Sequence, residues 1–347
     1  MFVTDLNKRR KKILQTIVEL YTETAVPVSS QAIAQRLRSR VSTATVRNMM
    51  QDLDELGLIW QPHTSAGRIP TDLGYRYYID SLLEQEQLTY QEKELIERQY
   101  PAQQEVFDEL LKEMLRILSN FSGYTTMAFS SGLRRILFKR LELVSVESTK
   151  LLVMLVSPEG LVKTALIQLP YQLEQEELSK IARFLNDQFE ALTLDEIKER
   201  LSLQVLSTHD AFFHILEHAH KILELAQMNF GKDMLYLEGT SHILEYPEFH
   251  SAQKLQAVFK AFEQQESLLA VFRNSLDYDG VQVRIGKENP YAEIQDCSLV
   301  ISNFKAKNKN LGALGIIGPR RMAYARVIAA VNYMCCVLNE RIARTGI

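Results

Sequence analysis

The sequence has few of the features that mark exported, membrane-bound or redox-active proteins. Its 347 residues include only three cysteines, Cys297, Cys335 and Cys336, which form no spaced metal-binding or redox motif. A chain with so few cysteines and no disulfide framework fits a reducing compartment.

Long hydrophobic runs are also missing. The longest apolar stretches, such as residues 151–156, are far shorter than the roughly 20 residues that a membrane-spanning helix needs. No hydrophobic signal-peptide region follows the basic run at residues 8–12. We therefore expect a soluble, cytoplasmic protein that makes no membrane contact.

Motifs for the common catalytic chemistries are missing as well. No glycine-rich phosphate loop, paired-carboxylate site or Ser/His/Asp arrangement stands out, so we predict that the chain is not an enzyme and needs no cofactor. Residues 214–218 fit the H-x-x-E-H pattern of a class of zinc proteases, with His209 and His220 nearby. His214 and His218 would share a helix face, as a metal pair must, but a third ligand is not evident. Metal binding is the alternative, and we favour ordinary histidines on an amphipathic helix.

Charge is unevenly distributed, although the net charge is only −3. The first 50 residues carry nine Lys and Arg side chains against three Asp and Glu. A basic segment of this kind is expected where a protein approaches phosphates, although a solvated charged surface would have the same composition.

This basic segment has the pattern of three short helices. Apolar residues recur at helical spacing from Ile13 to Leu20. Ser29 or Ser30 can cap a second helix, and Ser42 can cap a third.

A hairpin pattern follows the third helix. Gly57 would end that helix, and the short apolar run 58–60 and the polar turn 63–68 predict a β-hairpin wing. Three helices and a wing predict a winged helix-turn-helix DNA-binding domain at residues 1–83.

The third helix is the candidate DNA-reading element. An apolar stripe centred on Val46, Met50 and Leu53 would face the core and leave the opposite face exposed. A recognition helix meets base edges with its N-terminal half, where a small alanine permits close approach and Asn or Gln can pair with adenine. The predicted recognition-helix residues are Thr43, Ala44, Thr45, Arg47, Asn48 and Gln51.

A second group of residues would contact the DNA backbone. Basic side chains bind phosphates without reading sequence, and the donor side chains of a wing suit backbone or minor-groove contacts. Arg68 has an alternative role, because it could hold the turn by pairing with Asp72. The predicted wing and backbone residues are His63, Thr64, Ser65, Arg68, Lys8, Arg9, Arg10, Lys11 and Lys12.

The rest of the chain predicts an α+β fold. Linking helices are expected at residues 84–122. Strand-like runs at 141–146, 151–156 and 161–169, with a turn at 158–160, precede helical patterns over about 174–275, further strand-like runs at 281–285, 298–304 and 311–317, and a helix at 322–341. We predict one domain formed by residues 123–174 and 275–347 and interrupted by a mostly helical insertion at 175–274.

Two amino-terminal motifs are long enough to compare with known families. Residues 42–50 read Ser-Thr-Ala-Thr-Val-Arg-Asn-Met-Met, and residues 63–71 read His-Thr-Ser-Ala-Gly-Arg-Ile-Pro-Thr. Further motifs lie at residues 56–58, 74–78, 302–304 and 312–322. Together they resemble HrcA, the family of bacterial heat-inducible transcription repressors, over nearly the whole chain.

The resemblance implies an architecture and a function. It implies a GAF-like α/β domain behind the winged helix, interrupted by an inserted dimerisation domain. It also implies a homodimer on double-stranded DNA, bound to the CIRCE inverted repeat ahead of chaperone operons of the grpE-dnaK-dnaJ and groELS type. Heat stress would relieve repression, and the chaperonin GroEL would support the active state.

The sequence leaves the dimer contact and a ligand site open. A palindromic operator requires a two-fold protein, and stripes such as Phe213, Leu216 and Ile222 make the insertion the candidate dimer contact, although they could also pack within one subunit. GAF-like domains often hold ligands, but we favour a core role for Tyr291, Phe304 and the helix from Met322.

Overall fold

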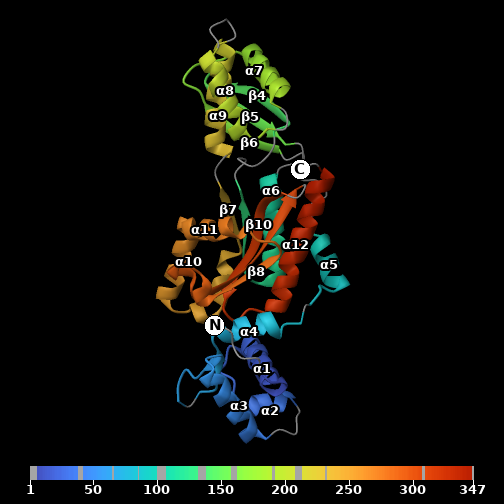
Figure 1. Ribbon diagram of the computed structural model, residues 1–347, viewed down its shortest axis with the longest axis vertical. Coiled ribbons are helices and arrows are strands. Elements are labelled where there is room, and N and C mark those ends of the chain that lie inside the picture. Colours follow the sequence, from blue (N-terminus) through green and yellow to red (C-terminus); the bar gives the residue numbers. More distant parts are fainter. Residues whose placement is uncertain are drawn as a thin grey trace.

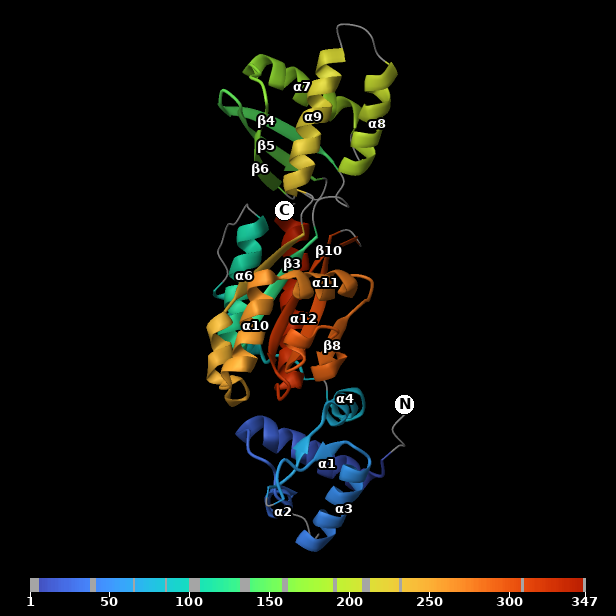
Figure 2. The same cartoon turned by 90° about the vertical axis from the view of Figure 1, so that its left-hand side faces the viewer.

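The computed structural model is elongated, with three bodies in a row along its long axis (Figure 1). It describes the chain apart from residues 1–5, 38–41, 65, 85, 100–106, 132–137, 158–161, 190–191, 208–212, 231–232, 307–308 and 346–347. The view turned by 90° shows the same order, with the amino-terminal body at one end and the central sheet in the middle (Figure 2).

The amino-terminal body is the winged helix-turn-helix that the sequence predicts. Its helices pack around the buried side chains of Ile17, Val46, Leu53 and Leu58. In chain order, the elements are α1 (Lys8–Thr24), α2 (Ser30–Leu37), α3 (Thr43–Glu55), β1 (Ile59–Trp60), β2 (Ile69–Pro70) and α4 (Asp72–Ser81).

The central body is built on a five-stranded antiparallel sheet. Its strand order is β7-β3-β10-β9-β8. The strands are β3 (Thr125–Ser130), β7 (Met234–Glu238), β8 (Val281–Ile285), β9 (Cys297–Ala306) and β10 (Lys309–Pro319).

Helices cover both faces of the central sheet. On one face lie α6 (Phe107–Ser122) and α12 (Tyr324–Thr345), and on the other lie α10 (Ala252–Gln264) and α11 (Glu266–Ser275). Because side chains alternate along a strand, Met127 and Phe129 enter the core beneath α11, and Ala128 enters the opposite core. The short helix α5 (Tyr90–Glu97) packs outside α6.

The distal body has its own three-stranded sheet. Strands β4 (Arg140–Glu147), β5 (Lys150–Val156) and β6 (Val162–Gln168) pair in that order. Helices α7 (Gln175–Gln188), α8 (Leu194–Ser207) and α9 (Phe213–Phe230) accompany this sheet, with α7 against β4 and α9 against β6. The chain leaves the central sheet after β3 and returns at β7, which pairs with β3.

The predicted grouping of strands is therefore wrong. Among the described residues, β4, β5 and β6 pair only with one another, and α10 and α11 pack on the central sheet. The interruption runs from β4 to α9 and is not the expected helical segment 175–274. Periodicity identifies strands but not their partners, and the short strands β3 and β7 that flank the interruption carry little periodic signal. The expected turn at 158–160 lies outside the described residues.

The predicted dimer stripe on α9 is largely internal. Leu216 and Ile222 are buried in the distal body, so their contacts lie within one subunit.

Within the described ranges, no helix combines the length and the apolarity needed to cross a bilayer.

Candidate nucleic-acid interface

The recognition helix α3 begins and ends where the sequence predicts. The Ser42 Oγ accepts the backbone N–H of Thr45 at 3.2 Å, which caps the helix. Gly57 follows the helix with a φ of +72°, a conformation that suits glycine. Val46, Met50 and Leu53 are buried, as predicted.

The opposite face of α3 is presented to solvent. The side chains of Thr43, Ala44, Arg47, Asn48 and Gln51 are exposed. The sixth predicted residue, Thr45, is half-buried, and its hydroxyl lies 3.0 Å from the Ser42 Oγ. The structure thus places five of the six predicted residues on an accessible surface and gives Thr45 a part in the helix cap.

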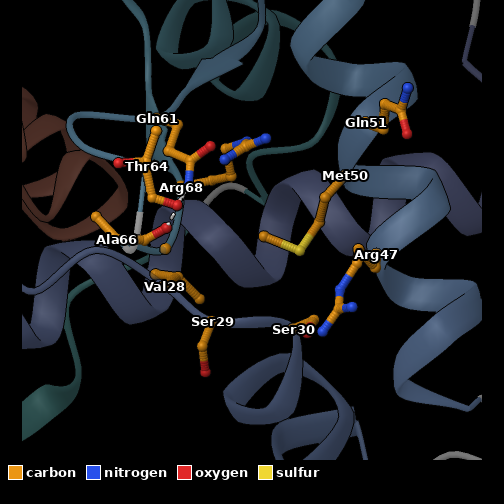
Figure 3. Close-up of a pocket in the computed structure, with 11 residues that line it drawn as sticks. Val28, Ser29, Ser30, Arg47, Met50, Gln51, Gln61, Thr64, Ala66 and Arg68 are labelled. Atoms are coloured by element: carbon orange, nitrogen blue, oxygen red, sulfur yellow. Dashed lines mark hydrogen bonds between the residues drawn. The ribbon is translucent and has the colours of Figure 1, made fainter.

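A groove of about 450 Å³ separates α3 from the wing. In Figure 3, Met50 of α3 extends toward the wing residues, and Arg47 extends toward Ser30 at the start of α2. The groove is lined by Val28, Ser29, Ser30, Arg47, Met50, Gln51, Gln61, Thr64, Ala66, Gly67 and Arg68. The sequence does not predict the contribution of Ser29, Ser30 and Gln61, because it indicates a capping role for the two serines and places the wing contacts at residues 63–68.

The wing is fixed by backbone pairing and by a glutamine. Val28 and Arg68 exchange two backbone hydrogen bonds, each 2.9 Å long. The Gln61 amide donates to the carbonyl oxygens of Thr64 and Ala66 at 2.9 and 2.8 Å. A Cβ at Gly67 would lie 2.4 Å from the Val28 carbonyl oxygen, so the close approach of wing and α2 entry requires glycine.

The wing arginine pairs with the recognition helix. The Arg68 Nη2 lies 3.0 Å from the Asp54 Oδ2, and the arginine side chain is 21% exposed. The alternative pairing of Arg68 with Asp72 is therefore wrong, and Asp72 pairs with Arg320. His63 and Thr64 are exposed in the wing, and Ser65 lies outside the described residues.

The basic run forms the first turns of α1. Lys8, Arg9 and Lys12 are exposed, and Lys11 is half-buried. The Arg10 guanidinium donates to the Asp52 Oδ2 from Nε and Nη2, at 3.0 and 2.6 Å, and thereby ties α1 to α3. The positive end of the helix dipole coincides with Lys8 and Arg9, and this combination attracts anions.

The histidines of α9 are engaged with side chains of the distal body. His218 Nδ1 lies 2.8 Å from the Tyr171 hydroxyl, and His220 Nε2 lies 3.0 Å from the Ser202 Oγ. In the part of the chain that the structure describes, no three His, Cys, Asp or Glu side chains are grouped to hold a metal ion. His209 lies outside those residues.

The residues considered for a ligand pocket belong to the central body. Phe304 and Met322 are buried in its core, and the Phe304 ring packs edge-on against Phe107 with centroids 6.0 Å apart. Tyr291 packs against the other core, beneath α10 and α11. A packing role accounts for these side chains.

The amino-terminal body combines a capped helix that has an exposed polar face with a groove, a wing and nearby cations. This combination defines a DNA-binding protein of the winged helix-turn-helix class. The sequence model described as winged helix-turn-helix transcription repressor, HrcA DNA-binding, matches residues 5–81, and that of the HrcA protein C-terminal domain matches residues 108–328. The chain belongs to the HrcA family.

Relatives that match nearly the whole chain carry the same family name. The heat-inducible transcription repressor HrcA of Pelotomaculum thermopropionicum is 34% identical over 98% of this chain and 97% of its own length. The corresponding repressor of Syntrophobacter fumaroxidans is 35% identical over 99% of both chains. A crystal structure of a hypothetical protein, 23% identical, shares the fold with a TM-score of 0.67 over 98% of this chain and all of that one.

Proposed function

We propose that this HrcA-family chain represses chaperone operons of the grpE-dnaK-dnaJ and groELS type by occupying the CIRCE inverted repeat as a homodimer in the cytoplasm. The observation that carries the proposal is the exposed row of Ala44, Asn48 and Gln51 on a capped helix beside the wing groove. A dimer on the operator would block transcription sterically, and heat stress would relieve the block by removing active dimer.

Base reading is assigned to the exposed face of α3. The side-chain amides of Asn48 and Gln51 can each donate to N7 and accept from N6 of adenine in the major groove. Arg47, one position before Asn48, can reach guanine or a phosphate. Thr43 and Thr45 lie in the first turn, where the helix would meet the groove edge.

Phosphate binding is assigned to the cations and donors around that face. Lys8, Arg9, Lys11 and Lys12 would contribute affinity that does not depend on sequence. The exposed His63 and Thr64 of the wing would contact the adjacent backbone, together with Ser65. Arg10 and Arg68 already pair with Asp52 and Asp54, so we assign them mainly to positioning α1 and the wing against α3.

Dimerisation is assigned to the outer face of the distal sheet. The strand register aligns Val144, Leu152 and Leu166 in one row across β4, β5 and β6. Val144 is 43% exposed and Leu166 is 55% exposed, on the sheet face opposite the buried Leu151, Val153 and Leu155. An apolar row open to solvent needs a cover, and a second copy of the chain supplies the two-fold symmetry that an inverted repeat requires.

We propose that the central body is the GAF-like domain that the family resemblance implies, and we assign it no ligand. We also infer, from the family resemblance, that the chaperonin GroEL supports the active state. If the repressor needs chaperonin to fold, damaged proteins that compete for the chaperonin would lower its active fraction. Refolding the denatured chain with and without chaperonin checks this inference. A higher recovery of operator binding with chaperonin is expected, and equal recovery would count against it.

Selection of DNA by the full chain tests the proposed function. The purified protein is incubated with a random duplex library at moderate salt, and the bound fraction is sequenced over several rounds. Enrichment of an inverted repeat supports the proposal. Enrichment of nothing, or of an asymmetric site alone, contradicts it.

A further inference from the structure

The winged domain meets the central body through α4, and the joint has a small apolar centre. The ring of Tyr75 in α4 packs against the ring of Tyr324 at the start of α12, with centroids 5.9 Å apart. Both side chains are buried. Charged and polar contacts surround this ring pair.

Asp72, in the first turn of α4, bonds to two segments of the central body. Its Oδ1 accepts the Arg320 Nη1 at 3.0 Å, and its Oδ2 accepts the backbone N–H of Lys287 at 3.0 Å. A Cβ at the neighbouring Gly286, whose φ is +52°, would lie 2.2 Å from that Oδ2. The glycine therefore permits the contact.

Arg76 lies one turn further along the same helix. Its Nε and Nη2 donate to the two carboxylate oxygens of Glu288 at 2.9 and 2.5 Å, and Nη2 also donates to the Val283 carbonyl oxygen at 2.6 Å. A bidentate arginine–carboxylate pair fixes direction as well as distance, because the guanidinium is a planar fork. Asp72 lies one turn away on α4 and is also bonded to the central body. The two residues therefore fix the direction of the helix.

A third contact reaches α1. The Arg321 Nη1 donates to the Thr22 carbonyl oxygen, near the carboxyl end of α1, at 3.1 Å. The same guanidinium pairs with Glu248 of the central body, and its side chain is 12% exposed. Two helices of the winged domain are thus held at defined points.

We propose that Asp72 and Arg76 are positioning residues for operator binding. With Glu288 and Arg320 they form the α4 latch, which sets the angle between each winged domain and its central body. This inference rests on the proposed function. The recognition helix lies at one end of the molecule and the proposed dimer face at the other (Figure 1), so the latch angle sets the separation of the two recognition helices in the dimer.

An inter-domain interface of this kind moves by default unless something holds it. The latch residues lie away from the exposed face of α3. They therefore influence DNA binding only through the position of α3. Breaking the latch should therefore widen the range of half-site separations that the dimer accepts, and leave the contact with one half-site intact.

The test compares full-length variants on duplexes of different geometry. Arg76→Gln removes the fork, and the near-isosteric Asp72→Asn removes the charge that faces Arg320. Asp80→Asn is the matched control. Asp80 also pairs with Arg76, at 3.3 Å, but this contact lies within α4 and does not join α4 to the central body. The duplexes are the inverted repeat, the same repeat with its spacer lengthened or shortened by two base pairs, and a single half-site. Thermal unfolding and solution mass establish that each variant is folded and dimeric.

We expect Arg76→Gln and Asp72→Asn to weaken binding to the natural spacing about fivefold or more, to flatten the dependence on spacer length, and to change half-site affinity less than about twofold. Asp80→Asn should match the unmodified chain. An unchanged spacer dependence, or an equal loss on the half-site, would overturn the latch. If Arg76→Gln fails to fold, Asp72→Asn decides the outcome. Failure of the unmodified chain to prefer the inverted repeat would instead contradict the proposed function.

Discussion

The accessible surface of α3 is determined by single residues. Its cap, its apolar stripe and its exposed face each depend on neighbours within a few positions, and such local patterns can be predicted from the sequence. The ion-pair partner of Arg68 cannot be predicted from local patterns. Asp72 lies closer to Arg68 in the sequence than Asp54 does, yet the fold brings the Asp54 carboxylate to the Arg68 guanidinium.

The first prediction separates base reading from phosphate binding. Asn48→Ala should weaken binding to the inverted repeat by about 1–3 kcal/mol and relax the preference at one base pair, because a paired hydrogen bond to a base edge is lost. The measurement is a titration against the operator and single-base variants. Arg9→Ala is the comparison, and it should weaken binding to all duplexes alike. Uniform loss from both substitutions would refute the assignment of Asn48.

The second prediction concerns thiol reactivity. Burial raises the pKa of the Cys335 thiol to about 12, so at pH 8 it stays protonated and inaccessible. Cys297 is also buried, and burial raises its pKa as well. Cys336 is exposed. Alkylation of the native chain should modify Cys336 first, with mass spectrometry as the readout, and rapid modification of Cys335 in folded protein would contradict the packing of α12.

At the scale of elements, the sequence predicted most helices and strands but not which strands share a sheet. β3 and β7 lie about a hundred residues apart, and their pairing closes the central sheet around the distal body. Pairing of this kind depends on packing between distant segments, which periodicity does not report. For the same reason, the contact between Arg76 and Glu288, 212 residues apart, has no signal in the sequence.

The third prediction concerns the wing. Gly67→Ala would push a Cβ into the Val28 carbonyl and separate the wing from the start of α2. We expect a loss of about 1–3 kcal/mol in stability, the usual cost of overpacking, and weaker operator binding. Chemical denaturation and DNA titration measure the two effects. His63→Ala, in the exposed turn of the same wing, should leave the stability unchanged. Equal stability of Gly67→Ala and the unmodified chain would refute the proposed steric role of Gly67.

At the scale of the whole molecule, the elongated shape separates DNA reading from the proposed dimer contact. The winged domain lies at one end, the distal sheet at the other, and the central body connects them (Figure 2). Through the proposed α4 latch, a change in the packing of the central body would alter operator binding without touching a DNA-contacting residue.

The fourth prediction tests the dimer face. Leu166→Asp should convert the dimer to a monomer, because a charge on β6, at the more exposed end of the apolar row, cannot be buried without a partner. Leu95→Asp is the matched control, since Leu95 of α5 is 54% exposed in a different body. Light scattering gives the mass. A Leu166→Asp variant that remains dimeric would place the contact elsewhere.

The proposed function requires that the exposed face of α3, duplicated by a dimer, reads a symmetric DNA site. A single titration tests it most directly: the full chain against the inverted repeat and against a duplex of scrambled sequence and equal length, at moderate salt. We predict tighter binding to the inverted repeat by about a thousandfold or more, the lower range of specific recognition. Equal affinity for the two duplexes would show that α3 does not read a symmetric site.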